Sequence, residues 1–429
     1  MQVIKLKNLP AKDYQRIMSR SKGKSDEIIP QVKKIMEDVK TRGDTAIMEK
    51  YQSRFGKEYE FLKVTRAEIK AAYKQTGKDV IRALKKMIKN ITAVQKAQLP
   101  CKKDTRVSAE RGVAVWREWR AIEKVGIYIP GGKAIYPSSV LMTAIPAQIA
   151  GCKEIVMCSP AREGGRIPAA TLVAADMIGL TEIFKVGGAE AIAAMTYGTE
   201  TIPKVYKIFG AGNSYVTAAK MLALESINID MPAGPSEVFI IADETANPAF
   251  IAADLLADGE HGEDSACVLV TTSRQIAEET ILEIDKQLSN LSTRKRAEIA
   301  LKNYGLITLV DTIEEAIQFS NIYAPEHLEI MTKDADKLVS KIRNAGSVFV
   351  GMWTTKSSGD YATGANHVLP TGGMARMYPP LGVDSFGRWM QVQKCTKQGL
   401  QTIRKTIETI AEVEQLPAHR ESASIRFKK

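Results

Sequence analysis

Four histidines occur in this sequence, and each stands in a polar, turn-rich stretch beside carboxylates: His261, His327, His367 and His419. Bases and metal ligands concentrate in such stretches because a side chain there can reach a ligand. Any one of them alone is more often a satisfied surface or boundary histidine. The shared setting of the four indicates acid–base or metal chemistry.

Glu326 and His327 are adjacent and follow a proline in "YAPEHLEI". Neighbouring residues on a strand point to opposite sides, but at the first residue after a proline both can border a cleft. An imidazole takes protons near neutral pH, and a glutamate can activate water. The pair is therefore a candidate acid/base couple, with an exposed charge next to a polar histidine as the alternative.

A second group of polar residues has the types and spacing of metal ligands. Asp258 and His261 stand three residues apart near the end of the helical stretch "NPAFIAADLLADGEHG", so both project from its last turn. Asp360 and His367 follow in "SSGDYATGANH", and His419 lies in "LPAHRES". Two imidazoles with one or two carboxylates would suit zinc. Because such pairs are common by chance, this is a hypothesis that needs the other ligands nearby.

Glycine-rich turns follow several expected strands, in "YIPGGKAIYPSS", "VGGAEAI" and "FGAGNSYVTAAK". Ligands bind beyond the strand ends of open α/β sheets, so these turns favour a cofactor crevice. The third glycine of the dinucleotide fingerprint is missing from the last turn, so the pattern does not identify the cofactor.

Alternating short apolar runs and helical segments begin after about residue 121 and predict a parallel α/β fold. The first strands are expected at 125–130, 154–160, 182–188 and 204–210, and the second series at 236–243, 266–273, 306–311, 327–332 and 347–351. Two Rossmann-like halves are the simplest interpretation of these two series.

Four regions follow from this pattern. Residues 1–120 are expected to form a helical N-terminal region that contributes to the first domain, and 121–235 to form the first Rossmann-like domain. Residues 236–380 would form the second, carrying most of the active site. Residues 381–429 would form a dimerisation tail, with a helix that ends near Pro417 and a short strand-like segment after it.

The composition is that of a globular enzyme, with 45% hydrophobic and 25% charged residues. The net charge of +11 combines +16 from residues 1–120 with −5 from the rest of the chain. The basic residues of 1–120 fall on amphipathic helices, so nucleic-acid binding is disfavoured. No signal peptide or membrane-spanning stretch is evident, which predicts a cytoplasmic protein without a membrane partner. The five cysteines have neither a disulfide nor a zinc-ribbon pattern.

Taken together, these stretches closely resemble the histidinol dehydrogenase family over nearly the whole chain. The resemblance rests on the order and spacing of "KVGIYIPGGKAIYPSSVLM", "KIFGAGNSYVTAAK", "IDMPAGPSEVFIIAD", "EHG", "YAPEHLEI", "GDYATGANHVLPTGG" and "AEVEQLPAHRES". It implies zinc- and NAD-dependent oxidation of L-histidinol to L-histidine by way of L-histidinaldehyde, the last step of histidine biosynthesis. A related zinc/NAD dehydrogenase of another small alcohol, such as sulfopropanediol, is the alternative.

The resemblance also implies roles for individual residues. Glu326 and His327 would be the catalytic acid/base pair. The zinc-ligand positions hold Asp258, His261, Asp360 and His419, and the NAD positions hold Tyr128, Glu190 and Asn213. The substrate positions hold Ser236, Asp258, His261, His327, Asp360, His367, Glu414 and His419. The family's tail crosses to the neighbouring protomer, so a homodimer would complete each active site.

Two positions depart from the family pattern. Asp258 and Glu190 stand where the family usually has glutamine, which adds a negative charge near the expected zinc and another near the expected NAD. An aspartate can ligate zinc but should reduce its Lewis acidity. Glu414, by contrast, suits a cationic or imidazole-bearing substrate better than a sulfonate.

Overall fold

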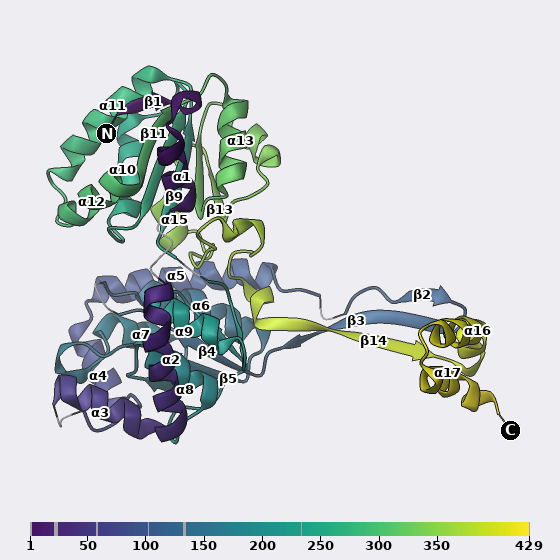
Figure 1. Ribbon diagram of the computed structural model, residues 1–429. Coiled ribbons are helices and arrows are strands. Elements are labelled where there is room, and N and C mark those ends of the chain that lie inside the picture. Colours follow the sequence, from purple (N-terminus) through teal and green to yellow (C-terminus); the bar gives the residue numbers. More distant parts are fainter. Residues whose placement is uncertain are drawn as a thin grey trace.

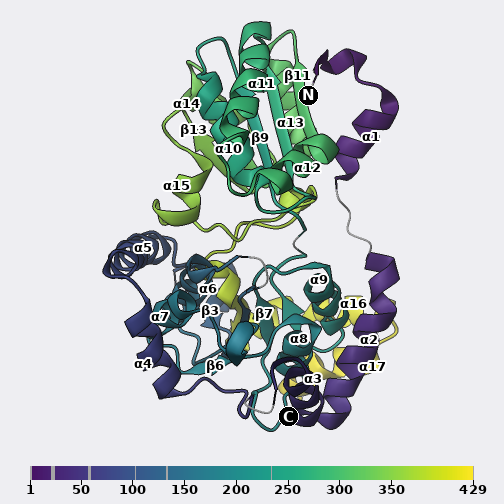
Figure 2. The same ribbon diagram turned by 90° about the vertical axis from the view of Figure 1, so that its left-hand side faces the viewer.

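The computed structural model describes residues 2–20, 25–56, 59–101, 103–131, 134–232 and 234–428. Two parallel β-sheets, each flanked by helices, lie one above the other in Figures 1 and 2. A long antiparallel arm extends sideways from the lower unit in Figure 1 and carries the C-terminal helices. The predicted fold class, α/β with parallel sheets, is confirmed.

The first sheet has five parallel strands in the order β6-β5-β4-β7-β8. Its strands are β4 (Lys124–Tyr128), β5 (Glu154–Cys158), β6 (Glu182–Phe184), β7 (Lys207–Phe209) and β8 (Asn228–Ile229). Three of them fall within the predicted segments, β4 begins one residue before its predicted start, and β8 is an addition of two residues. Helices separate these strands in the sequence, and parallel neighbouring strands require such crossover connections.

Helices cover both faces of this sheet. The crossover helices are α6 (Pro137–Ala150), α7 (Ala169–Met177), α8 (Gly188–Tyr197) and α9 (Ser214–Ala223), and the N-terminal helices are α2 (Ser25–Arg42), α3 (Asp44–Phe55), α4 (Arg66–Gln75) and α5 (Lys78–Ala97). Helix α5 buries Leu84, Met87 and Ile91 along one face. Its basic residues are left on the other face.

The second sheet has six parallel strands in the order β1-β11-β10-β9-β12-β13. Its strands are β1 (Val3–Lys5), β9 (Glu237–Ala242), β10 (Ala266–Thr271), β11 (Gly305–Leu309), β12 (His327–Met331) and β13 (Ser347–Val350). The accompanying helices are α1 (Ala11–Ser19), α10 (Pro248–Gly259), α11 (Arg274–Leu288), α12 (Arg294–Tyr304), α13 (Ile313–Tyr323), α14 (Ala335–Leu338) and α15 (Lys356–Tyr361). All five strands predicted for the second half belong to it.

The start of the chain differs from the predicted assignment of 1–120 to the first domain. Strand β1 pairs in parallel with β11 at the edge of the second sheet. The sequence between β1 and α2 passes from one sheet to the other, so the N-terminal segment contributes to both. Three residues are too short a run to reveal their partner from sequence, because pairing is decided by the edge that β11 leaves open.

The antiparallel arm was not predicted. It consists of β2 (Val107–Glu110), β3 (Val113–Ala121) and β14 (Gly387–Cys395), with β3 in the middle. Trp119 and Trp389 are paired across β3 and β14, and their rings meet edge to face at 5.8 Å. The partner strands lie more than 250 residues apart in sequence, and such non-local pairing leaves no local pattern.

The tail prediction is wrong in one respect. Helix α16 (Lys397–Val413) is followed by a second helix, α17 (Pro417–Ser424), and a 3₁₀ turn, with no strand. Gln415 takes a positive φ of 59° between the helices, and Pro417 begins α17. Proline is favoured at a first helical position because its missing N–H has no intrahelical partner there. None of the described helices has the length and apolar character to span a lipid bilayer.

Gly210 sits where strands β7 and β4 end side by side. Its φ is +113°, and a Cβ atom built on it would overlap the carbonyl oxygen of Tyr128. The backbone N–H of Gly210 donates to Asp230 Oδ2 at 2.7 Å. Only glycine combines this conformation with so close an approach.

We expect Gly210→Ala to destabilise the protein more than Gly179→Ala. Gly179 also has a positive φ, +77°, but no atom lies within 4 Å of its built Cβ. The control should lose about 1–2 kcal/mol through backbone strain alone, and the overlap at Gly210 should remove about 1–3 kcal/mol more. Equal losses in urea unfolding would contradict the close-approach argument.

Candidate active site

Glu326 and His327 lie at the amino end of strand β12, and both side chains are buried. Helix α13 ends at Tyr323, and Ala324 then takes a left-handed φ of 52° before Pro325 leads into the strand. This turn delivers both side chains to the amino edge of the six-stranded sheet, next to the start of β9.

The main chain of Glu237, at the start of β9, holds the two side chains. Its N–H donates to Glu326 Oε2 at 2.8 Å, and its carbonyl oxygen lies 2.9 Å from His327 Nδ1. A carbonyl oxygen can only accept, so Nδ1 carries the proton and Nε2 is the unprotonated nitrogen. Among the described residues, Nε2 has no hydrogen-bond partner.

The imidazole of His327 is neutral in this setting. Burial, together with the positive charge of Lys356, lowers the pKa of His327 to about 4. At neutral pH the ring therefore offers an Nε2 lone pair that no group in the described part of the chain uses. This is the arrangement of a base that waits for a proton from a bound ligand.

The carboxyl group of Glu326 has the opposite shift. Burial raises the pKa of Glu326 well above its ordinary value, and the negative charges of Asp258 and Glu237 add to the effect. Ser236 donates from its hydroxyl toward Glu326 Oε2 at 3.3 Å and toward Asp258 Oδ1 at 3.1 Å. A carboxyl group with a raised pKa can both accept and return a proton near neutral pH.

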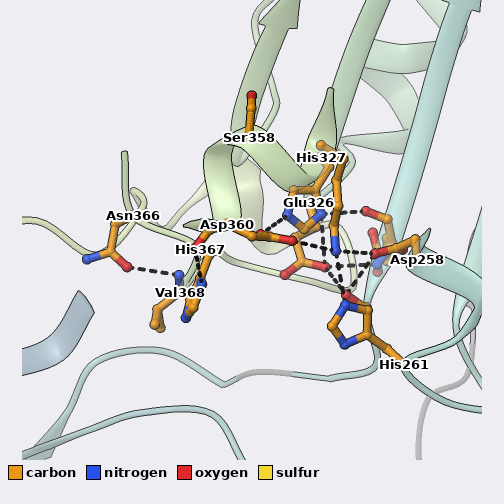
Figure 3. Close-up of polar contacts among 12 residues, drawn as sticks. Asp258, His261, Glu326, His327, Ser358, Asp360, Asn366, His367 and Val368 are labelled. Atoms are coloured by element: carbon orange, nitrogen blue, oxygen red, sulfur yellow. Dashed lines mark hydrogen bonds and ion pairs between the residues drawn. The ribbon is translucent and has the colours of Figure 1, made fainter. Parts of the chain in front are cut away.

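A buried lysine, Lys356, occupies the centre of the predicted metal site. Its Nζ lies 3.0 Å from Asp258 Oδ1, 3.1 Å from Asp360 Oδ2 and 3.1 Å from His261 Nε2. Figure 3 shows the side chains that converge on this region: Asp258, His261, Glu326, His327 and Asp360. The cluster joins the end of α10, the start of β12 and helix α15.

The geometry does not fit a zinc ion with Lys356 in this position. Three of the four predicted ligands, Asp258, His261 and Asp360, already accept from one ammonium group. Within the described ranges, no three His, Cys, Asp or Glu side chains are grouped as metal ligands. Zinc needs those same lone pairs, so no chemical step is assigned to it.

His367, a predicted substrate residue, contacts the main chain of Asp360 and the side chain of Ser139. Its Nε2 lies 3.2 Å from Ser139 Oγ, and its Nδ1 lies 3.2 Å from the main-chain oxygen of Asp360. Both ring nitrogens are therefore engaged, the second with the chain that carries Asp360. The contacts link α6 of the first unit, which contains the five-stranded sheet, to α15 of the second unit, which contains the six-stranded sheet.

The three predicted NAD residues lie together at the carboxyl edge of the first sheet. Tyr128 ends β4, Glu190 is in the first turn of α8 after β6, and Asn213 caps α9 after β7. This is the edge at which parallel α/β sheets bind ligands. The neighbouring predicted glycine turn includes Gly132 and Lys133, which lie outside the described residues.

The extra charge at Glu190 has a local partner. The Glu190 carboxylate is buried and forms an ion pair with Lys50 of α3. Lys50 offsets the negative charge that the sequence placed near an anionic cofactor. Any effect of the Glu190 charge on NAD binding therefore depends on Lys50 as well.

Two predicted site residues are not with the others. Glu414 and His419 lie on the tail helices at the end of the arm, and both are exposed. Figure 1 shows these helices well away from α15, the helix that carries Lys356. Within one chain they do not reach the site.

The sequence reasoning missed Lys356, Glu237 and Arg20. Lys356 stands four residues before Asp360 in "KSSGD", a spacing that brings two helical side chains together and could have revealed it. Glu237 and Arg20 give no such signal because they are distant in sequence. Arg20 Nε lies 3.0 Å from Glu237 Oε1, and burial raises the pKa of Glu237 to about 7 despite this partner.

The site combines a buried histidine, whose Nε2 has no partner among the described residues, with a neighbouring carboxyl group, and a separate sheet edge is suited to a nucleotide. These are the features of an α/β enzyme that transfers protons and binds a cofactor. Comparison with known proteins then specifies the family. A protein-family model described as histidinol dehydrogenase matches residues 18–427, and the chain belongs to this family.

Individual relatives agree over the full length. The chain is 47% identical to a histidinol dehydrogenase of Bacteroides fragilis, with 96% of each chain covered. It is 45% identical to that of Methanocaldococcus jannaschii, with 100% of this chain and 99% of the relative covered. The crystal structure of histidinol dehydrogenase from Elizabethkingia anophelis aligns with a TM-score of 0.91 and 44% identity, covering 97% and 96% of the chains. The predicted family is confirmed.

We expect Arg20→Ala to lower the free energy of unfolding by about 3–5 kcal/mol at a pH above the pKa of Glu237, which is about 7, because it leaves the buried Glu237 carboxylate without its cation. The matched control is Arg274→Ala, whose pair with Glu278 is 61% and 57% exposed and should be worth less than about 1 kcal/mol. Chemical denaturation of both variants measures the difference. Similar losses would show that the Arg20 pair does not stabilise the site.

Proposed function

We propose that the chain is an NAD-dependent oxidoreductase that converts L-histidinol to L-histidine through L-histidinaldehyde, the last step of histidine biosynthesis. Membership of the histidinol dehydrogenase family supports this proposal. The structural observation that carries the chemistry is the unpartnered Nε2 of His327 beside the buried carboxyl group of Glu326.

In the first oxidation, His327 is the base. Its Nε2 would accept the hydroxyl proton of the alcohol, and NAD, when bound, would take the hydride from the carbon, which leaves the aldehyde. The Nδ1–H bond to the main-chain oxygen of Glu237 keeps the ring in the tautomer that this step requires. The neutral state of His327 at pH 7 supports this role.

In the second oxidation, Glu326 activates water. Its carboxylate would remove a proton from water as the oxygen adds to the aldehyde carbon, while His327 would return the proton that it took in the first oxidation to the carbonyl oxygen, giving the hydrated aldehyde. His327 would then accept a hydroxyl proton of the hydrated aldehyde, and a second NAD, when bound, would take the hydride, which leaves the carboxylic acid. The raised pKa of Glu326 matches a group that takes a proton from water and later releases it.

NAD would bind at the carboxyl edge of the first sheet, against Tyr128, Glu190 and Asn213. The N-terminus of α9, capped by the Asn213 side chain, provides a positive dipole end for a phosphate. Substrate would lie between this edge and the His327 cluster, with Ser236 and Asp360 as contacts. No step passes through a zinc ion, because Lys356 occupies the ligands that this chain would supply.

The active site would be completed in a homodimer. Helix α16 is amphipathic but buries only Gly399 and Ala411, and it leaves Val413 74% exposed and Ile410 51% exposed. Such a face is typical of a surface covered by a partner. Docking of the arm on a second chain would bring Glu414 and His419 to that chain's cluster.

Purified protein should form two NADH for each L-histidinol oxidised. His327→Ala should slow the first oxidation by about 10²–10⁴-fold, whereas Glu326→Gln should still form the aldehyde but oxidise added L-histidinaldehyde slowly. Glu278→Gln, which alters an exposed carboxylate on α11, serves as the control and should match the unaltered protein. Absence of NADH formation with histidinol would reject the proposal.

The shared site predicts complementation between inactive subunits. A heterodimer of one Glu326→Ala chain and one His419→Ala chain, purified through two different affinity tags, retains one intact site. We expect about half the activity of the unaltered dimer. Activity no higher than that of either mutant homodimer would exclude a site completed by the tail of the other subunit.

A further inference from the structure

The ammonium group of Lys356 is fully satisfied by the residues predicted to bind zinc. A protonated lysine has three N–H donors, and Lys356 has three acceptors at 3.0–3.1 Å: Asp258, His261 and Asp360. The side chain is 2% exposed. Each donor is matched, so the buried cation needs no water or further ligand.

The acceptors surround the ammonium group as they would surround a metal ion. Zinc bonds to nitrogen and oxygen ligands are about 2.0–2.2 Å long. Ligand distances to zinc would therefore result if each acceptor atom moved about 1 Å closer to the position that Nζ occupies. Nζ and a metal ion cannot occupy this point together. His261 makes the competition explicit, because the Nε2 lone pair that would bind zinc accepts from Lys356.

Lys356 is also well placed to remain there. It is the first residue of α15, and Thr355 caps this helix by accepting from the N–H of Ser358. The spacing of four residues along α15 brings Lys356 to Asp360. Departure of the ammonium group would leave Asp258 and Asp360 as buried carboxylates without a cation, which is strongly unfavourable.

We propose that Lys356 replaces the metal ion in this chain: its ammonium group supplies the positive charge that holds Asp258, His261 and Asp360 together, and the folded protein keeps zinc out of the site. Lys356 is thus a positioning residue. The proposal goes beyond the oxidation of histidinol and does not depend on the alcohol that is oxidised.

Zinc content provides the test. The full-length protein and its variants are produced with added zinc, equilibrated with zinc, desalted, and analysed by inductively coupled plasma mass spectrometry. We expect the unaltered protein to hold less than about 0.1 zinc per chain, and Lys356→Met to hold about one, the stoichiometry of a single mononuclear site. Adding His261→Ala to Lys356→Met should abolish that gain.

Two controls keep the result specific. Lys185→Met removes another buried lysine, paired with Glu68 at 3.0 Å in the first unit, and should not increase zinc binding. Lys356→Gln is a second variant in case Lys356→Met does not fold, as judged by circular dichroism and gel filtration.

Stoichiometric zinc in the unaltered protein that disappears in His261→Ala overturns the proposal, as does a folded Lys356 variant that gains no zinc. The zinc measurement is independent of turnover. Failure to oxidise histidinol would therefore reject the proposed function and leave this inference standing.

Discussion

The site depends on balancing several carboxylates inside a protein. Asp258, Asp360, Glu326 and Glu237 are all buried near the imidazole of His327, and ionising all four together is unfavourable because like charges repel and burial disfavours a charge. Two cations from distant parts of the chain counter it: Lys356 contacts the two aspartates, and Arg20 contacts Glu237. With that charge compensated, burial can lower the pKa of His327 and raise the pKa of Glu326, which places a neutral imidazole next to a carboxyl group that can exchange protons near neutral pH.

The two sheets contribute different edges. The first offers the carboxyl ends of its strands, where Tyr128, Glu190 and Asn213 lie, and the second offers the amino ends of β9 and β12, where Glu237 and His327 lie. Helix α15 lies between the two units in Figure 2. The segment after β13 contains α15 and then His367, which contacts Ser139 of the first unit. This segment therefore connects the two units and holds the two sheet edges near each other.

Much of the fold followed from local patterns. The strand runs alternate with helical stretches and are buried on both faces, which is why their positions and parallel arrangement could be predicted. The arm could not be predicted, because β3 and β14 are far apart in sequence and become strands by pairing with each other. Pro417 was misleading, since a proline that ends one helix is equally suited to begin the next.

For the site, the sequence by itself determined the chemical groups: an adjacent glutamate and histidine, an Asp258–His261 pair, and a distant His419 in the family's order. Only the tertiary structure decided what those groups face. Nothing local states that Lys356 lies among Asp258, His261 and Asp360, or that the main chain of Glu237 fixes the tautomer of His327. Residue types set which bonds can form, whereas burial and the approach of separate elements decide which bonds do.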